Sequence, residues 1–124
     1  MDGRSTFPKC ERLQRTYEFR RVYERGRRVE GRFVVLYVLE DTMAAAATER
    51  RAIGVVTSRK IGNAVARNRA RRLLREAYRL NKHKLKSNLQ IVMVARAAIR
   101  GKRLQEIEAC LLDLFRGAGA LVES

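Results

Sequence analysis

The sequence is poor in the residues that protein-based catalysis, zinc binding or a secreted scaffold would need. Its 124 residues include no Trp, one Pro, one His and two Cys. Cys10 and Cys110 lie far apart and neither belongs to a CxxC pair, so a disulfide framework and a zinc site are both disfavoured. His83 stands between two lysines and is expected in a charged surface turn. Most histidine-based catalytic sites are therefore excluded.

Acidic residues and long hydrophobic runs are also scarce. There are 13 Asp and Glu against 28 Lys and Arg, which gives a formal net charge of +15 and a sequence pI near 11.1. Because 46% of the residues are hydrophobic, the composition indicates a folded domain with a polyanionic partner and not a disordered basic tail. Binding to a membrane surface would require an amphipathic helix with bulky apolar anchors opposite its basic face, and the chain has no Trp. No apolar run is long enough to cross a bilayer.

The length suits one domain with one modest core. We expect a flexible basic arm over residues 1–12, a single α+β domain over 13–118 and a short C-terminal tail over 119–124. The first ten residues, MDGRSTFPKC, lack the apolar stretch of a signal peptide. The chain is therefore expected to be cytoplasmic.

Hydrophobic periodicity predicts six main elements. Apolar residues at helical spacing predict a helix over 16–25 that ends before Gly26, and another over 104–116. Three apolar runs rich in β-branched residues, 33–39, 52–58 and 89–95, predict strands. The stretch from Asn63 to about Lys82 has no Gly or Pro and begins with a good N-cap. The order α-β-β-α-β-α predicts a small sheet of three to four strands with three helices, and residues 41–51 would form a hairpin connection.

The predicted central helix concentrates the positive charge. Between Arg59 and Lys86 there are eleven basic residues and one acidic residue, Glu76. At about 100° per residue, one helix face would hold the following basic or polar residues: Asn68, Arg71, Arg72, Arg75, Arg79 and Lys82. The opposite side would hold Ala66, Ala70, Leu73, Ala77 and Leu80. Guanidinium groups bind phosphates through paired hydrogen bonds. A face that is only exposed to solvent would usually have glutamates between its basic residues. This face therefore predicts nucleic-acid binding.

The loop before this helix, TSRKIGN over residues 57–63, is polar and contains a glycine. Backbone amides at a helix N-terminus favour anions, so the loop would extend the phosphate-binding surface. Taken alone it is a weak signal, because a Gly-Asn pair before a helix is common capping chemistry.

The string SRKIGNAVARNRARRLLREAY, from Ser58 to Tyr78, resembles the signature of the bacterial ribonuclease P protein subunit, with Arg67-Asn68-Arg69 as its RNR core. YEFRRVYERG, from Tyr17 to Gly26, looks like the family's first helix, and LYVL, over 36–39, looks like one of its strands. With the downstream strand and helix, the resemblance covers almost the whole chain.

The resemblance implies a non-catalytic subunit of an RNA endonuclease, which helps a catalytic RNA with bound Mg²⁺ to remove the 5′ leader of precursor tRNA. It implies a left-handed strand-helix-strand crossover and no membrane or DNA partner. Carried onto this chain, and with the preceding loop included, the expected catalytic-RNA-binding residues are Arg59, Lys60, Asn63, Arg67, Asn68, Arg69, Arg71, Arg72 and Arg75. The expected leader-binding residues, in a cleft between the first helix and the sheet, are Phe19, Tyr23 and Tyr37.

Several alternatives remain open at this point. Phe19 is equally compatible with a role as an ordinary core residue, whereas the tyrosine hydroxyls favour a partly polar environment. A protein-only nuclease would need clustered carboxylates, and the nearest pairs, Glu40 with Asp41 and Glu106 with Glu108, are expected on the surface. A structural protein of the ribosome would share the charge and the small α+β fold. Identification of the bound RNA would separate that possibility from a ribonuclease P subunit.

Overall fold

The computed structural model of the chain describes residues 16–40, 52–86 and 88–122. Within these ranges the chain forms three α-helices and four strands, with short 3-10 helices in the connections. The helices are α1 (Thr16–Arg25), α3 (Ala64–Asn81) and α4 (Leu104–Gly117). The strands are β1 (Arg27–Glu30), β2 (Val34–Glu40), β3 (Ala52–Val56) and β4 (Leu89–Ala95), and the 3-10 helices are η2 (Arg59–Ile61), η3 (Lys82–Lys84) and η4 (Ala97–Ile99).

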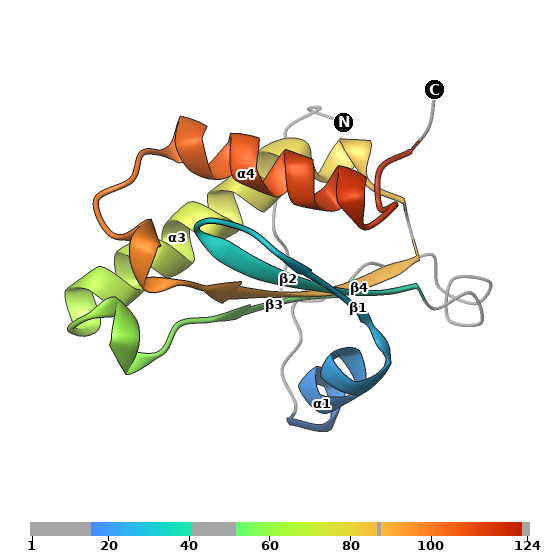
Figure 1. The fold of residues 1–124 in the computed structure, drawn as a ribbon, viewed down its shortest axis with the longest axis horizontal. Helices are drawn as coiled ribbons and strands as arrows, with labels where there is room; N and C mark the ends of the chain where they lie inside the picture. Colours follow the sequence, from blue (N-terminus) through green and yellow to red (C-terminus); the bar gives the residue numbers. More distant parts are fainter. Residues whose placement is uncertain (1–15, 41–51, 87, 123–124) are drawn as a thin grey trace, which may run out of the picture.

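One mixed sheet separates the helices into two layers. Its strand order is β1-β2-β4-β3, with β4 antiparallel to β2 and parallel to β3. The register pairs Val34 with Ala95 across β2 and β4, and Ala52 with Gln90 across β3 and β4. Helices α3 and α4 cover one face of the sheet, and α1 lies on the other (Figure 1). The α+β class and the predicted order of the main elements are confirmed.

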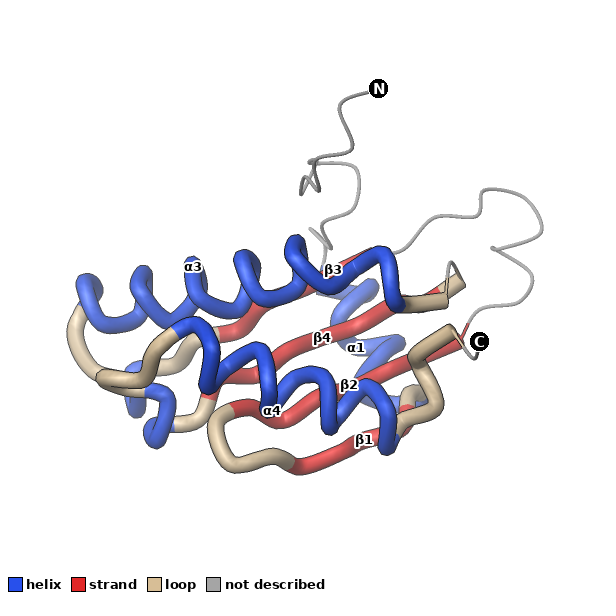
Figure 2. Tube along the Cα trace, turned by 90° about the horizontal axis from the view of Figure 1, so that it is seen from above, coloured by secondary structure: helices blue, strands red, loops and turns tan. Residues whose placement is uncertain are grey.

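The connection from β3 through α3 to β4 is left-handed. In Figure 2, α3 lies on the viewer's side of the sheet, and β3 and β4 both run from right to left, with β4 below β3. Turned so that the strands point upward, β4 therefore lies to the left of β3. Crossovers between parallel strands are right-handed in about 98% of cases, so this hand, which the family resemblance implied, is the uncommon one.

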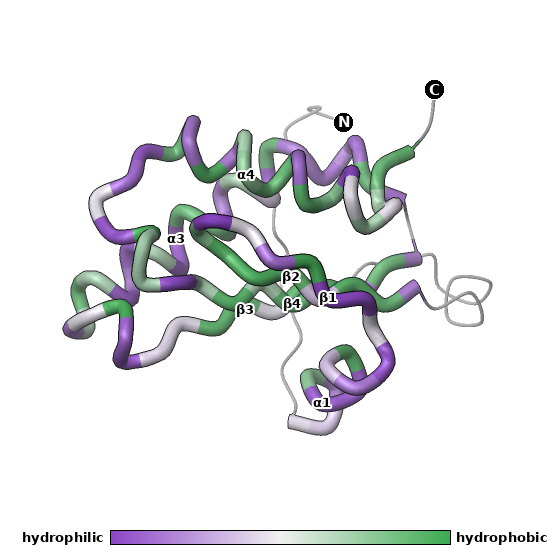
Figure 3. The backbone as a smooth tube through the Cα atoms, in the orientation of Figure 1, coloured by the Kyte–Doolittle hydropathy of each residue, from purple (hydrophilic) through white to green (hydrophobic). Residues whose placement is uncertain are grey.

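Alternation along the central strands builds a core on each face of the sheet. On β2, Val34, Leu36 and Val38 are buried against α3 and α4 in the large core. The intervening Tyr37 and Leu39 face α1, where they pack around Val22 and Val92 in a smaller cluster. The central strands accordingly appear mostly green between more hydrophilic helices in Figure 3. Such two-sided burial explains why the sequence of β2 is a continuous apolar run.

Helix α3 begins where the sequence predicts. The side chain of Asn63 accepts a hydrogen bond from the backbone N–H of Ala66 at 2.9 Å, as an N-cap does. The predicted buried side was partly wrong. Leu74 and Tyr78 are fully buried, whereas Leu73 is only partly buried beside the same core. The buried face is rotated from the predicted one because α3 packs against both the sheet and α4.

Two features of the sheet differ from the sequence prediction. Strand β1 was not predicted as a separate element, and it pairs with β2 through Arg27↔Val38 to Glu30↔Val35. The expected hairpin connection between β2 and β3 was wrong, because β4 lies between them in the sheet. The alanine-rich residues 43–47 fall outside the described residues, as does the predicted arm over 1–12.

Gly26 allows the sharp turn from α1 into β1. Its N–H donates to the carbonyl of Val22 at 2.8 Å, and a Cβ at this position would lie 2.5 Å from that carbonyl oxygen. A side chain is therefore excluded by the backbone itself.

Near residue 122, where the described part of the chain ends, Ala120 is buried in the large core and Leu121 forms a bridge with Leu85, so residues 120–121 pack against the domain.

Candidate nucleic-acid interface

The basic residues of the loop and the first half of α3 form a largely exposed surface. Its members, here called the α3 basic surface, are Arg59, Lys60, Arg67, Asn68, Arg69, Arg71 and Arg72. Arg59, Lys60, Asn68 and Arg72 are exposed, and the other three are half-buried. The loop is ordered by caps: Ser58 Oγ accepts from the N–H of Lys60 at 3.3 Å, and Asn63 caps α3.

Arg71 is held at the centre of this surface by neutral groups. Its Nη1 donates to Asn68 Oδ1 at 3.0 Å, and its Nη2 donates to Thr57 Oγ1 at 2.7 Å. Neither acceptor carries a charge, so the guanidinium is positioned without being neutralised. The sequence predicted that Thr57 belongs to the loop before α3, but it did not predict that Thr57 orients Arg71.

The charges of the α3 basic surface have no ion-pair partner in the part of the chain that the structure describes. Among the described residues, no carboxylate lies within ion-pair distance of Arg59, Lys60, Arg67, Arg69, Arg71 or Arg72. Elsewhere in the domain arginines do have such partners, for example Arg116 with Asp113 at 3.2 Å and Arg28 with Glu30 at 2.9 Å. Repulsion between neighbouring like charges on one helix is unfavourable, so this surface is suited to a polyanion that neutralises it.

Arg79 lies on the predicted basic face, but its charge is paired within the helix. Its guanidinium forms a bidentate pair with Glu76, with Nε to Oε1 at 2.9 Å and Nη2 to Oε2 at 2.5 Å. The hydrogen bonds from Arg79 lower the pKa of the Glu76 carboxyl below its usual value. The basic face therefore weakens toward the C-terminal end of α3, and Arg75, which is half-buried, lies between the two regions.

Two of the three predicted leader-binding residues are in contact on the other face of the sheet. The rings of Tyr23 on α1 and Tyr37 on β2 meet edge to face, with centroids 4.8 Å apart and an interplanar angle of 82°. Tyr23 is 38% exposed, and partial burial, followed by the nearby Tyr37, raises its pKa. Phe19 lies beside them but packs on Val22 and Val92, so part of its role is structural.

A chain of polar contacts fixes Tyr37 from the edge strand. Arg28 Nε on β1 donates to the Tyr37 hydroxyl at 3.3 Å, and Arg28 Nη2 pairs with Glu30 at 2.9 Å. Arg96 also approaches Glu30, at 3.8 Å. Hydrogen bonding and the charge of Arg28 lower the pKa of Glu30. Arg28 was not predicted as a site residue, because its contact with Tyr37 depends on the pairing of β1 with β2.

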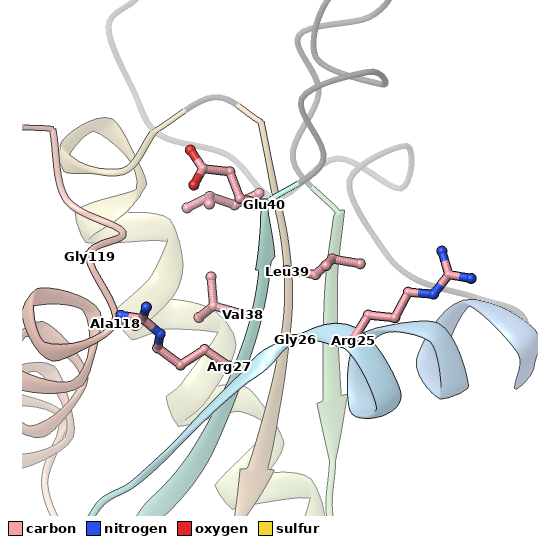
Figure 4. Close-up of a pocket in the computed structure, with 9 residues that line it drawn as sticks. Arg25, Gly26, Arg27, Val38, Leu39, Glu40, Ala118 and Gly119 are labelled. Atoms are coloured by element: carbon pink, nitrogen blue, oxygen red, sulfur yellow. The ribbon is translucent and has the colours of Figure 1, made fainter.

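The pocket drawn in Figure 4 has a volume of about 480 Å³ and lies where α1 and α4 end. Arg27 extends toward Ala118, and Glu40 is the one acidic residue in its lining (Figure 4). Glu40 is itself approached by Asn88 Nδ2 at 3.4 Å and by Lys86 Nζ at 3.9 Å. None of the predicted site residues lines this pocket.

Acidic residues elsewhere serve structural contacts. Glu106 accepts from the backbone N–H of Arg103 at 2.9 Å, which caps α4, and Glu108 accepts from Asn81 Nδ2 at 2.9 Å. Over the described ranges, no group of three or more His, Cys, Asp or Glu side chains is arranged to hold a metal ion. None of the helices in these ranges is long and apolar enough to cross a membrane.

Among the described residues, one side of the small sheet carries arginines without carboxylate partners, and the other side carries two tyrosine rings in contact. Phosphates bind guanidinium groups, and the bases of single-stranded RNA stack on aromatic rings. This combination defines an RNA-binding protein. The model of the Ribonuclease P family matches residues 7–119. A curated relative, the ribonuclease P protein component of Clostridium acetobutylicum, is 39% identical over 92% of this chain and 93% of its own.

Solved structures agree with this assignment. A mutant of the Staphylococcus aureus RNase P protein, described as defective in mRNA degradation, has 26% identity and a TM-score of 0.80, covering 91% of this chain and 92% of its own. The RNase P protein of Thermotoga maritima shares the fold, with 24% identity and a TM-score of 0.73, covering 92% of this chain and 99% of its own. The chain therefore belongs to the ribonuclease P protein family. It is the protein subunit of an enzyme that cleaves precursor tRNA and whose catalysis is carried by RNA.

Proposed function

We propose that this protein binds the catalytic RNA of ribonuclease P through the α3 basic surface and receives the 5′ leader of precursor tRNA on the face of Tyr23 and Tyr37. Binding of the catalytic RNA is supported by one observation: among the described residues, the arginines of the α3 basic surface have no carboxylate partners. Asn63, Arg75 and the members of the α3 basic surface are the proposed contacts.

The leader site rests on the geometry of the aromatic pair. Tyr37 is half-buried and fixed by Arg28, while Tyr23 leaves part of its ring accessible. A base of an unpaired leader could stack on such a ring, which is worth about 1 to 3 kcal/mol per base. The sheet lies between the two surfaces, so both RNAs can bind at once. In this proposal Mg²⁺ is held mainly by the RNA partner, and the compartment is the cytoplasm.

Reconstitution tests the division of labour. Purified protein incubated with precursor tRNA and Mg²⁺ should leave the substrate uncut, and addition of the ribonuclease P RNA from the same genome should produce cleavage at the 5′ end of the mature tRNA. The protein should lower the Mg²⁺ and substrate concentrations that the RNA needs. Cleavage by the RNA-free protein would refute the proposal.

The leader site has a separate test with a matched control. In the holoenzyme, Tyr37→Ala should reduce the preference for substrates with a leader over those without one by about 1 to 3 kcal/mol, the stacking energy of one base. Tyr17→Ala is the control, because Tyr17 is a 63% exposed tyrosine of α1 that is not in the Tyr23–Tyr37 contact. Equal preferences in the two variants would remove Tyr37 from the site.

A further inference from the structure

A small basic cleft lies beside the α3 basic surface, between α3 and the connection from β4 to α4. It has a volume of about 210 Å³ and is lined by Ala66, Arg69, Ala70, Ile99, Arg100 and Gly101. Pockets for drug-sized molecules usually measure roughly 300 to 1,000 Å³, so this one suits a smaller group. No carboxylate lines it.

Two guanidinium groups reach this cleft from different elements. Arg69, on α3, donates from Nη2 to the backbone carbonyl of Lys102 at 3.0 Å. Arg100, which follows η4, lies against the loop before α3: a Cβ built on Gly62 would be 3.4 Å from its Cζ and Nη1. Among the described residues, neither arginine has a carboxylate within ion-pair distance.

The backbone leaves the mouth of the cleft open. Gly101 has φ +75°, and no atom lies within 4 Å of where its Cβ would be. The next residue, Lys102, does not line the cleft, and its Nζ lies 5.5 Å from the centre of the Phe33 ring. In the sequence, this is the short run Arg-Gly-Lys-Arg over residues 100–103, which lies outside the basic stretch from Arg59 to Lys86.

The cleft continues the α3 basic surface. Arg69 and the exposed Arg72 are three residues apart and are therefore neighbours on the helix. Arg69 in turn shares the cleft with Arg100, and no acidic residue lines it.

We propose that this cleft binds one phosphodiester group of the catalytic RNA, contacted by Arg69 from α3 and by Arg100 from the β4–α4 connection. The inference rests on the proposed function and extends the RNA-binding surface beyond the central helix. A phosphate fits because its oxygens accept the parallel N–H donors that guanidinium groups present, and because the small volume admits one such group.

Arg100→Gln is the informative variant, since its side chain is exposed and forms no ion pair within the described residues. Binding to transcribed ribonuclease P RNA is measured over a series of salt concentrations. The slope of log affinity against log salt should fall by about one unit, as for one lost phosphate contact. Arg100→Lys should retain most of the slope. Arg116→Gln is the matched control, because Arg116 already pairs with Asp113, and it should leave the slope unchanged.

A double-mutant cycle tests whether both arginines contact the same phosphate. The loss of affinity caused by Arg100→Gln should be smaller in an Arg69→Gln background than in the wild type, because contacts to a shared group are not independent. Effects that multiply independently would refute the shared site. Equal melting temperatures would establish that Arg100→Gln folds.

The outcomes separate this inference from the proposed function. If the wild-type protein fails to bind the RNA, the proposed function itself fails. If the wild type binds and Arg72→Gln lowers the salt slope while Arg100→Gln behaves like Arg116→Gln, only the cleft is refuted.

Discussion

The two halves of α3 differ both in charge and in surroundings: AVARNRARR, over 64–72, has four arginines and no acidic residue, whereas LLREAYRLN, over 73–81, has two arginines and one glutamate. In the first half, Arg71 is oriented by Thr57 and Asn68, which carry no charge. In the second half, Arg79 is paired with Glu76, and Asn81 is buried with its amide bonded to Glu108 of α4. The charge of the second half is thus partly neutralised where the helix packs inside the protein, whereas the first half retains its charge for a partner.

The comparison shows that a count of basic residues does not define a binding surface. Arg72 and Arg79 lie on the same predicted helix face, yet only Arg79 has an intrahelical carboxylate partner. In the function proposed above, the presence or absence of such a partner separates the residues expected to bind phosphate from those that stabilise the helix.

The largest expected effect comes from the core that both halves share. Leu74 is fully buried in the middle of α3, so Leu74→Ala should lower the free energy of unfolding by about 2 to 5 kcal/mol. Leu73→Ala, at a partly buried position, should cost less. Urea unfolding measures both. If the two variants lost equal stability, the helix orientation described above would be wrong.

A smaller effect distinguishes the two halves directly. Arg72→Gln should reduce the salt dependence of binding to the catalytic RNA by about one unit of slope, because one phosphate contact is lost. Arg79→Gln removes the same charge from a residue that already has a partner, so its slope should stay closer to that of the wild type. Filter binding over a salt series measures the difference, and identical slopes would contradict the distinction between the halves.

The smallest effect concerns stability and pH. The folded-state pKa of Glu76 is below its ordinary value of 4.5, so its pair with Arg79 contributes stability above that value and loses it as pH falls through the folded-state pKa. Glu76→Gln should therefore lower the melting temperature slightly at neutral pH, and the difference from the wild type should shrink in acid. Asp113→Asn, which breaks a more exposed pair, is the control and should cost less. A difference that grew in acid would contradict the assignment.

Much of the fold could be predicted from the sequence. The helix over 16–25 and the strand over 89–95 have the predicted bounds, and Asn63 caps α3 as expected. These features are local: apolar periodicity, a capping side chain and a glycine stop are read within a few residues. The RNR string in the first half of α3 likewise indicated the family before any geometry was known.

The parts that could not be predicted depend on contacts between distant residues. Strand β1, with the sequence RRVE, has no apolar alternation, and it becomes a strand because β2 offers an open edge. The contact between Arg28 and Tyr37 depends on that pairing. The Glu76–Arg79 pair is a three-residue spacing on a helix and could have been read from the sequence. The roles of the individual RNA-binding residues stay predictions.

The position of β4 in the sheet determines when the chain can fold during its synthesis. The last strand in the sequence lies between two earlier ones, so β2 and β3 have no mutual hydrogen bonds and are joined only through it. During synthesis the basic helix leaves the ribosome before the strand that completes the sheet beneath it. A nascent chain that stops short of Leu89 therefore exposes apolar strand edges and a highly charged helix together, and the native sheet can close only after β4 has been synthesised.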